Sequence, residues 1–229
     1  MSLRSRIPSP LLAVAVAVGL MLLAYGGGNV AALVGVQLFD LLGVELTLRW
    51  TFLLSVVSVQ LLFFTGVSLG YLRYRDLSLS DIGVELPSLE GWIVVVVGFV
   101  SMIVLWLASS IASFVIGERL GVERDPQAIF EMAQQDPFVF VLLGTLSILI
   151  VGPAEELLFR GVIQTRLRET FGAAAAITIA TAIFASVHLT GYATLAGGLL
   201  GVAVLFVVGL VLAVSYEYTG NLIVVALIH

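Results

Sequence analysis

Long apolar runs separated by short polar loops dominate the hydrophobic pattern of this chain. The runs cover roughly residues 10–26, 52–72, 91–117, 137–158, 173–190 and 195–215, and a last one begins at residue 221. Most are about 17 to 26 residues long, the length that lets a helix cross about 30 Å of hydrocarbon. None shows the alternating segments of roughly ten residues that are typical of a membrane β-barrel. Because backbone groups in lipid must be paired within their own segment, the pattern predicts an all-α, polytopic transmembrane helical bundle with about seven to eight spans.

Three apolar segments do not fit a simple span. Residues 30–42 are interrupted by Gln37 and Asp40 and are interpreted as an interfacial or re-entrant helix. The run from residue 221 ends after nine residues, about 13 Å of helix, so we expect the chain as given to stop inside a span. The first run follows two arginines, as in a signal peptide. No clear small-x-small cleavage site comes after it, only Tyr25 and three glycines, so a first span or signal anchor is favoured over a cleaved peptide.

Arginine counts in the short loops predict the orientation of the spans. All ten basic residues are arginines, and loops that face the cytoplasm carry an excess of such residues. If the N-terminus is cytoplasmic, seven arginines fall in inner segments and three in outer segments. The inner set is Arg4, Arg6, Arg73, Arg75, Arg160, Arg166 and Arg168, and the outer set is Arg49, Arg119 and Arg124. We therefore expect an integral membrane protein with a cytoplasmic N-terminus, in the plasma membrane of a prokaryote.

Composition supports a membrane protein and excludes other classes. Apolar residues make up 60% of the chain and charged residues 11%, whereas a soluble domain carries about 25% charged residues. The net charge is −5 and no basic stretch is present, so membrane lipid is an expected partner and nucleic acid is not. The absence of cysteine rules out disulfides and thiolate chemistry.

Four ionisable side chains lie within or at the ends of the predicted spans. Glu155 and Glu156 come near the end of the fourth span, His188 ends the fifth, and His229 lies in the last apolar run. A charged group at the membrane centre costs at least about 2.5 kcal/mol, so such residues usually mark a functional site. On the predicted topology the glutamates lie toward the cytoplasmic end and His188 near the outer end. Either a span boundary is misplaced, or the site lies in a deep, water-filled cavity.

The spacing of the residues around the two glutamates indicates which groups can meet. Glu156 and Arg160 are four residues apart, so on a helix they share a face and can form an ion pair. Glu155 points about 100° away from its neighbour and is free for a different partner. The pair Gly152–Pro153 just before them is expected to weaken or kink the helix and to admit water.

These residue types in this pattern suggest hydrolysis by an activated water molecule. A carboxylate in a low-dielectric pocket can act as a general base toward water. One neutral imidazole could orient that water, and a second could donate to the developing oxyanion. Phe184 stands four residues before His188 and can pack against its ring. No cysteine is present and no serine stands in a recognisable nucleophile setting, so no other nucleophile is predicted. The Glu156–Arg160 pair alone would fit a structural role, so the prediction depends on the combination across three spans.

Two short patterns in the C-terminal half resemble a known family. Residues 155–160 read E-E-L-L-F-R and match E-E-x-x-x-R, and residues 184–188 read F-A-S-V-H and match F-x-x-x-H. His229 stands where a third motif, H-x-x-x-N or H-x-x-x-D, would begin. In this order the motifs resemble the CPBP family of intramembrane proteases, which includes CAAX prenyl protease 2 and the bacteriocin-processing, Abi-type proteins. The resemblance covers residues 137–229, interpreted as a catalytic core cut short at its C-terminus. Residues 1–136 are N-terminal transmembrane helices that match the family poorly.

The resemblance implies an intramembrane endopeptidase whose substrate is a membrane-anchored peptide or lipidated protein, CAAX-type prenylated proteins among them. It implies that Glu155 activates water with His188 as its partner. It also implies that Glu156 and Arg160 shape the site and that His229 helps to hold the oxyanion. No cofactor is expected. A zinc ion held by Glu155, His188 and His229 is the less favoured alternative, because the H-E-x-x-H spacing is absent.

Two functions without proteolysis stay open at this point. The chain could be a membrane partner or immunity-type protein that keeps the family fold, or a proton-coupled transporter with an intramembrane Glu and His relay. Transport would be favoured by a symmetry between two halves, and the sequence shows none. A Glu155→Gln variant separates an enzyme from a binding partner, since a binding role should tolerate it.

Overall fold

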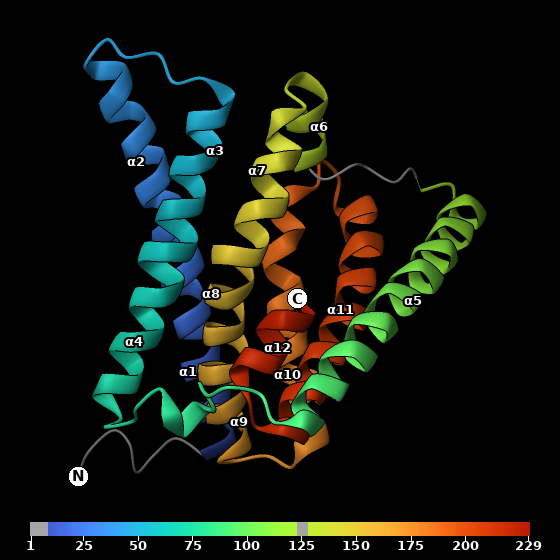
Figure 1. The fold of residues 1–229 in the computed structure, drawn as a ribbon. Helices are drawn as coiled ribbons and strands as arrows, with labels where there is room; N and C mark the ends of the chain where they lie inside the picture. Colours follow the sequence, from blue (N-terminus) through green and yellow to red (C-terminus); the bar gives the residue numbers. More distant parts are fainter. Residues whose placement is uncertain (1–8, 123–127) are drawn as a thin grey trace.

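The computed structural model describes residues 9–122 and 128–229, and in these residues it contains helices and no strand. Six helices are long and apolar enough to cross a membrane, and a short seventh, Leu222–Ile228, follows them. The six are Ser9–Leu41, Leu48–Tyr74, Leu89–Leu120, Phe138–Arg168, Ala173–Gly191 and Leu195–Thr219. The predicted all-α transmembrane bundle is confirmed, and this number of helices is roughly consistent with seven to eight spans (Figure 1).

The long helices are built from α-helical segments joined by wider or tighter turns. The α-helical segments are α1 (Ser9–Met21), α2 (Gly27–Leu41), α3 (Leu48–Val56), α4 (Thr65–Tyr74), α5 (Leu89–Leu120), α6 (Ala128–Gln135), α7 (Phe138–Leu146), α8 (Gly152–Glu156), α9 (Thr165–Arg168), α10 (Ala173–Ser186), α11 (Leu195–Thr219) and α12 (Leu222–Ile228). The π-helical turns are η2 (Leu22–Gly26), η3 (Val57–Phe64), η5 (Ser147–Val151) and η6 (Leu157–Gln164), and the 3-10 turns are η4 (Ser80–Ile82) and η7 (Val187–Gly191). Turns of the π type are often found at functional sites. Three of them, η3, η5 and η6, contact α8, which carries Glu155 and Glu156.

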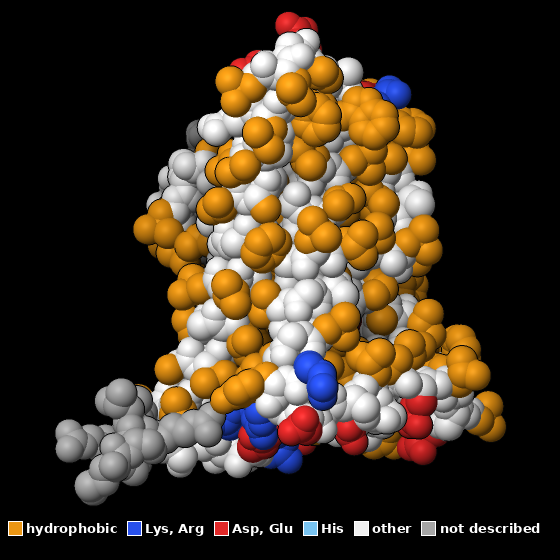
Figure 2. Space-filling model, turned by 90° about the vertical axis from the view of Figure 1, so that its left-hand side faces the viewer, with side chains coloured by type: hydrophobic (Ala, Val, Ile, Leu, Met, Phe, Trp, Pro, Cys, Tyr) orange, Lys and Arg blue, Asp and Glu red, His pale blue; other side chains and the backbone are white. Residues whose placement is uncertain are grey.

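The surface of the bundle is that of a protein surrounded by lipid. On the face seen in Figure 2, apolar side chains cover the sides and charged side chains gather at the two ends. Helix α5 is the most lipid-exposed span, with 11% of its apolar window buried. Of the arginines expected on the inner side, Arg75 pairs with Glu169 and Arg168 pairs with Glu217 at one end of the bundle. Arg160 is instead buried within the bundle, and Arg4 and Arg6 lie outside the described residues.

Residues 30–42 do not form a separate interfacial or re-entrant helix, so that prediction is wrong. They continue the first helix, which runs from Ser9 to Leu41. The glycines before them do not break the helix because they serve a close contact. A Cβ atom on Gly27 would lie 2.4 Å from Phe63, and one on Gly28 would lie 2.7 Å from Val59. The small residues therefore let α2 lie against η3, and one π-helical turn absorbs the local irregularity.

The predicted end of the fourth span at residue 158 is also wrong, because this helix continues to Arg168. Two polar residues in this stretch, Arg160 and Gln164, are buried against α11. Arg160 donates to the backbone carbonyl of Gly209 at 3.2 Å, and Gln164 donates to that of Ala213 at 3.0 Å. The predicted kink at Gly152–Pro153 takes the form of the π-helical turn η5 directly before it, and the helix is not broken.

This longer helix removes the conflict over depth between the glutamates and His188. Glu155 lies 13 residues before Arg168, and His188 lies 15 residues after Ala173, where the next helix returns from the same end. At 1.5 Å per residue, both lie roughly 20 Å from that end of the bundle. The misplaced boundary was therefore the cause of the conflict.

Helix α12 carries His229 into the middle of the bundle. It starts beside the end of α11 and runs inward between α5, α8 and α11, so that the C-terminal residue lies at mid-height (Figure 1). Glycines line its path: a Cβ atom on Gly98 would lie 2.6 Å from Ile228, and one on Gly91 would lie 3.1 Å from Val224. A side chain at position 98 would therefore have to displace the side chain of Ile228.

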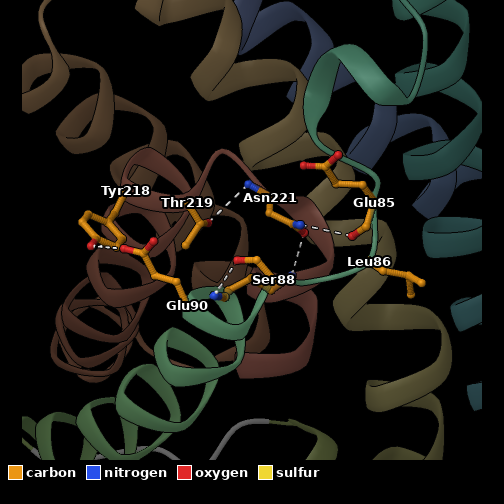
Figure 3. Close-up of a pocket in the computed structure, with 9 residues that line it drawn as sticks. Glu85, Leu86, Ser88, Glu90, Tyr218, Thr219 and Asn221 are labelled. Carbon is orange, nitrogen blue, oxygen red and sulfur yellow. Dashed lines mark hydrogen bonds between the residues drawn. The ribbon is translucent and has the colours of Figure 1, made fainter.

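The loop before α5 fixes the start of α12. The side chain of Asn221 caps α12 by accepting from the backbone N–H of Val224 at 3.1 Å, and its amide donates to the backbone carbonyl of Glu85 at 3.1 Å (Figure 3). The backbone N–H of Leu222 donates to the carbonyl of Gly83 at 2.9 Å. Gly83 has φ of 74°, and a Cβ atom there would lie 1.8 Å from the carbonyl oxygen of Gly220.

We expect Gly83→Ala to lower the thermal unfolding midpoint and to weaken the seating of α12. The substitution combines a left-handed backbone, which costs roughly 1–2 kcal/mol for a residue with a Cβ atom, with a collision against backbone that cannot rotate away. Gly43→Ala is the matched control, because Gly43 has φ of 72° and no atom within 4 Å of the added Cβ. Tryptophan fluorescence during heating in detergent would measure both. If the unfolding midpoint fell equally in Gly83→Ala and Gly43→Ala, the contact of the new Cβ atom with Gly220 would not destabilise the protein.

Candidate active site

Glu156, Arg160 and His229 form a buried ionic cluster. The guanidinium of Arg160 donates to Oε1 of Glu156 at 3.0 Å, and the two side chains are 1% and 0% exposed. The Nδ1 atom of His229 lies 2.7 Å from the same oxygen, so the carboxylate joins α12 to the fourth span. The other oxygen of Glu156 is buried without a hydrogen-bond partner among the described residues. The predicted Glu156–Arg160 pair is thus present, and it also positions His229.

Glu155 has a different environment from its neighbour, as its place on the helix predicts. Its Oε1 atom accepts a hydrogen bond of 3.1 Å from the side-chain amide of Gln60 in η3. Its Oε2 atom lies 3.9 Å from Nε2 of His229. Glu155 is nearly buried, but it lines two cavities. It is therefore the carboxylate of the pair that a bound molecule can reach.

The ring of His188 is held in one orientation by its own helix. Its Nδ1 atom lies 3.1 Å from the backbone carbonyl of Phe184. A carbonyl oxygen can only accept, so Nδ1 carries the proton and, in the neutral ring, Nε2 is left as an acceptor. The ring of Phe184 packs edge-on against the imidazole at 5.1 Å, and its face lies 4.5 Å from the guanidinium carbon of Arg160. The phenylalanine therefore connects the two motifs physically.

Two cavities meet at Glu155 and His188. One, of about 300 Å³, lies between α5, α10 and α11 and is mostly apolar. Besides these two residues it is lined by Met102, Ile103, Trp106, Phe184, Leu205, Val208, Leu212 and His229. The other, of about 470 Å³, extends from Glu155 past Gln60 toward α6 and the turn at Thr190. Glu155, His188 and His229, which come from three separate helices, thus line the same cavity of about 300 Å³.

The charges of the site can balance within it. Glu155 and Glu156 contribute two negative charges, and Arg160 contributes one positive charge. An imidazolium at His229, with Nδ1 toward Glu156 and Nε2 toward Glu155, would complete the balance. In that state Nε2 carries a proton that can be donated into the cavity, which is what an oxyanion formed there would require.

A metal ion bound to several side chains finds little support in the arrangement. In the part of the chain that the structure describes, no group of three or more His, Asp or Glu side chains is placed to hold one. Nδ1 of His229 is engaged with Glu156 and Nδ1 of His188 with a carbonyl. Each histidine therefore has only Nε2 left as a ligand atom.

All five candidate residues from the sequence come together at this place. Glu155, His188 and His229 line the cavity, while Glu156 and Arg160 lie behind them in the protein. Gln60 was missed, because a single glutamine in an apolar run carries no motif. Its one signal in the sequence is that it is the most polar residue within the second span.

Comparison with known proteins gives one result. Residues 137–229 match the family described as Rce1-like, type II CAAX prenyl endopeptidases, which confirms the resemblance seen in the sequence. The match contains Glu155, Glu156, Arg160, His188 and His229, and it does not extend to Gln60. No curated protein and no solved structure matches the chain significantly.

Proposed function

We propose that this chain, whose residues 137–229 match the Rce1-like family of type II CAAX prenyl endopeptidases, is an intramembrane endopeptidase. Its substrates would be membrane-anchored peptides, with CAAX-type prenylated or other lipidated proteins as the first class to test. The observation that carries the proposal is the meeting of Glu155, His188 and His229 in one apolar cavity. Three ionisable groups from separate helices are costly at this depth, and a structural bundle would not need them facing a cavity.

In the reaction we propose, a water molecule lies between Glu155 and Nε2 of His188. The carboxylate takes a proton from the water, and the oxygen adds to the carbonyl carbon of the scissile peptide bond. His229 donates from Nε2 to the oxyanion that develops on the carbonyl oxygen. The tetrahedral intermediate then breaks its C–N bond, and the proton held by Glu155 passes to the leaving nitrogen. The products are a new carboxylate and a new amine, with one water consumed.

The two cavities suggest how a substrate would lie. The apolar cavity beside Met102, Trp106 and Leu205 offers space to a lipid group or large apolar side chain. The second cavity carries Tyr25, Gln60 and Thr190 among apolar residues and suits a peptide backbone, whose polar groups need partners. The scissile bond would then cross the point where the cavities meet.

We expect the full chain in proteoliposomes to cleave a prenylated, membrane-anchored reporter peptide, and to keep cleaving it after exhaustive chelation. The reporter should be presented on both faces, since the second cavity extends toward α6, at the end opposite Arg75 and Arg168. Cleavage in ¹⁸O-labelled water should place the label in the new carboxylate, as direct attack by water requires. An unprenylated reporter with the same sequence and a different lipid anchor is the matched control for the substrate class.

Two outcomes would overturn parts of this proposal. Loss of activity on chelation with recovery on adding zinc would replace the glutamate mechanism by a metal-dependent one. Failure to cleave any reporter on either face would favour a non-enzymatic membrane partner of the same fold.

A further inference from the structure

Among the described residues, Gln60 is the one polar side chain from the N-terminal half of the chain that donates a hydrogen bond to a candidate catalytic group. It lies in the π-helical turn η3, in the middle of the helix Leu48–Tyr74. Its Nε2 atom donates to Oε1 of Glu155 at 3.1 Å across 95 positions of sequence. Its own Oε1 atom is buried and has no hydrogen-bond partner within the described part of the chain. A buried amide carbonyl without a hydrogen-bond partner costs free energy. This cost is removed if a water molecule or a substrate donates to the carbonyl oxygen of Gln60.

We propose that Gln60 is a positioning residue of the active site, which acts by holding the carboxylate of Glu155 while its carbonyl oxygen accepts a hydrogen bond from water in the adjoining cavity. This inference rests on the proposed function. It adds a residue outside the matched region 137–229. The N-terminal helices would then supply part of the active site in addition to surrounding it.

The geometry assigns a separate task to each end of the amide. The N–H group fixes Oε1 of Glu155, so that Oε2 is directed toward His229 and the space between the cavities. Gln60 lines the larger cavity, and its unpaired carbonyl oxygen is left to accept from a water molecule there. This water is distinct from the attacking one, whose two hydrogens point to Glu155 and to Nε2 of His188. It would hold the amide of Gln60 in place, and fixed placement of reacting groups is a large part of catalysis.

The side-chain amide of Gln60 is the uncharged group that donates a hydrogen bond to the carboxylate of Glu155. His229 faces it from α12, His188 faces the same cavities from η7, and Glu156 and Arg160 flank it on its own helix. Arg160 is committed to Glu156, so it does not replace an N–H donor at Oε1. Loss of that donor should disfavour the charged carboxylate.

The test compares Gln60→Met and Gln60→Glu with the wild type in the proteoliposome assay. Gln60→Met keeps the length of the side chain and removes both polar ends, and Gln60→Glu keeps the shape but places a second carboxyl group beside Glu155. We expect kcat to fall by about 10- to 100-fold in Gln60→Met, with KM changed less than kcat. The acidic limb of the pH–rate profile should move to higher pH in both variants, and further in Gln60→Glu. Gln37→Met, on the exposed face of α2, is the matched control and should behave as the wild type.

A second measurement keeps this inference separate from the proposed function. The infrared band of a protonated carboxyl group that disappears in Glu155→Gln reports Glu155 directly, with or without activity. At a fixed pH this band should be stronger in Gln60→Met than in the wild type. An active wild type whose pH profile and infrared band are unchanged by both Gln60 variants would overturn the role of Gln60 and leave the protease standing. An inactive wild type would overturn the proposed function, and an infrared band unchanged in Gln60→Met would then also overturn the contact of Gln60 with the carboxylate of Glu155.

Discussion

Glu155→Gln is expected to reduce kcat for reporter cleavage by about 10³- to 10⁴-fold, at the upper end of what a general base contributes. The effect should be this large because one carboxylate serves twice in the proposed reaction, first as the base for water and then as the acid for the leaving nitrogen. The amide has the same shape and cannot take a proton from water. The fall should appear in kcat, with little change in KM, since the group acts on reacting atoms.

Two comparisons make this result specific. Glu118→Gln changes an exposed glutamate near the end of α5 and should leave the rate unchanged. His188→Ala should also lower kcat strongly, and combining it with Glu155→Gln should add little, because residues that act as a unit are not additive. A Glu155→Gln variant that keeps a tenth or more of the wild-type rate would exclude Glu155 as the base.

Most of the fold could be predicted because it follows from local pattern. Continuous apolar runs of sufficient length require helices in lipid, and the structure has helices in each of the runs. Errors arose where polar residues in a helix are paired inside the protein. The helix Phe138–Arg168 continues past Arg160 and Gln164 because carbonyls of α11 accept their hydrogen bonds. Hydropathy alone treats such residues as the end of a span.

The candidate site could be predicted where its geometry is set within one helix. The Glu156–Arg160 pair and the contact of Phe184 with His188 both join residues four positions apart, and both are present. The contact of Gln60 with Glu155 depends on how two helices lie side by side, which no local spacing encodes. The role of His229 as a partner of Glu156 likewise depends on the inward path of α12.

Arg160→Met is expected to lower the free energy of unfolding by about 3–5 kcal/mol, the cost of leaving one charge of a buried pair without its partner. The partner is Glu156, which is 0% exposed and would keep only His229 at its Oε1 atom. Unfolding in mixed micelles at increasing SDS would measure the loss. Arg73→Met is the matched control, because Arg73 is 88% exposed and pairs with Asp76 at 3.8 Å. It should unfold as the wild type does.

The double variant Glu156→Gln with Arg160→Met separates stability from function in this cluster. Removal of both charges should restore much of the lost stability, since no unpaired charge is left in the interior. Activity should not return, because the neutral amide introduced by Glu156→Gln no longer supplies the carboxylate that orients His229 and favours its protonated form. If stability and activity both recovered in the double variant, the pair would be only structural, and His229 would be positioned by the packing of α12 against Gly98 and Gly152.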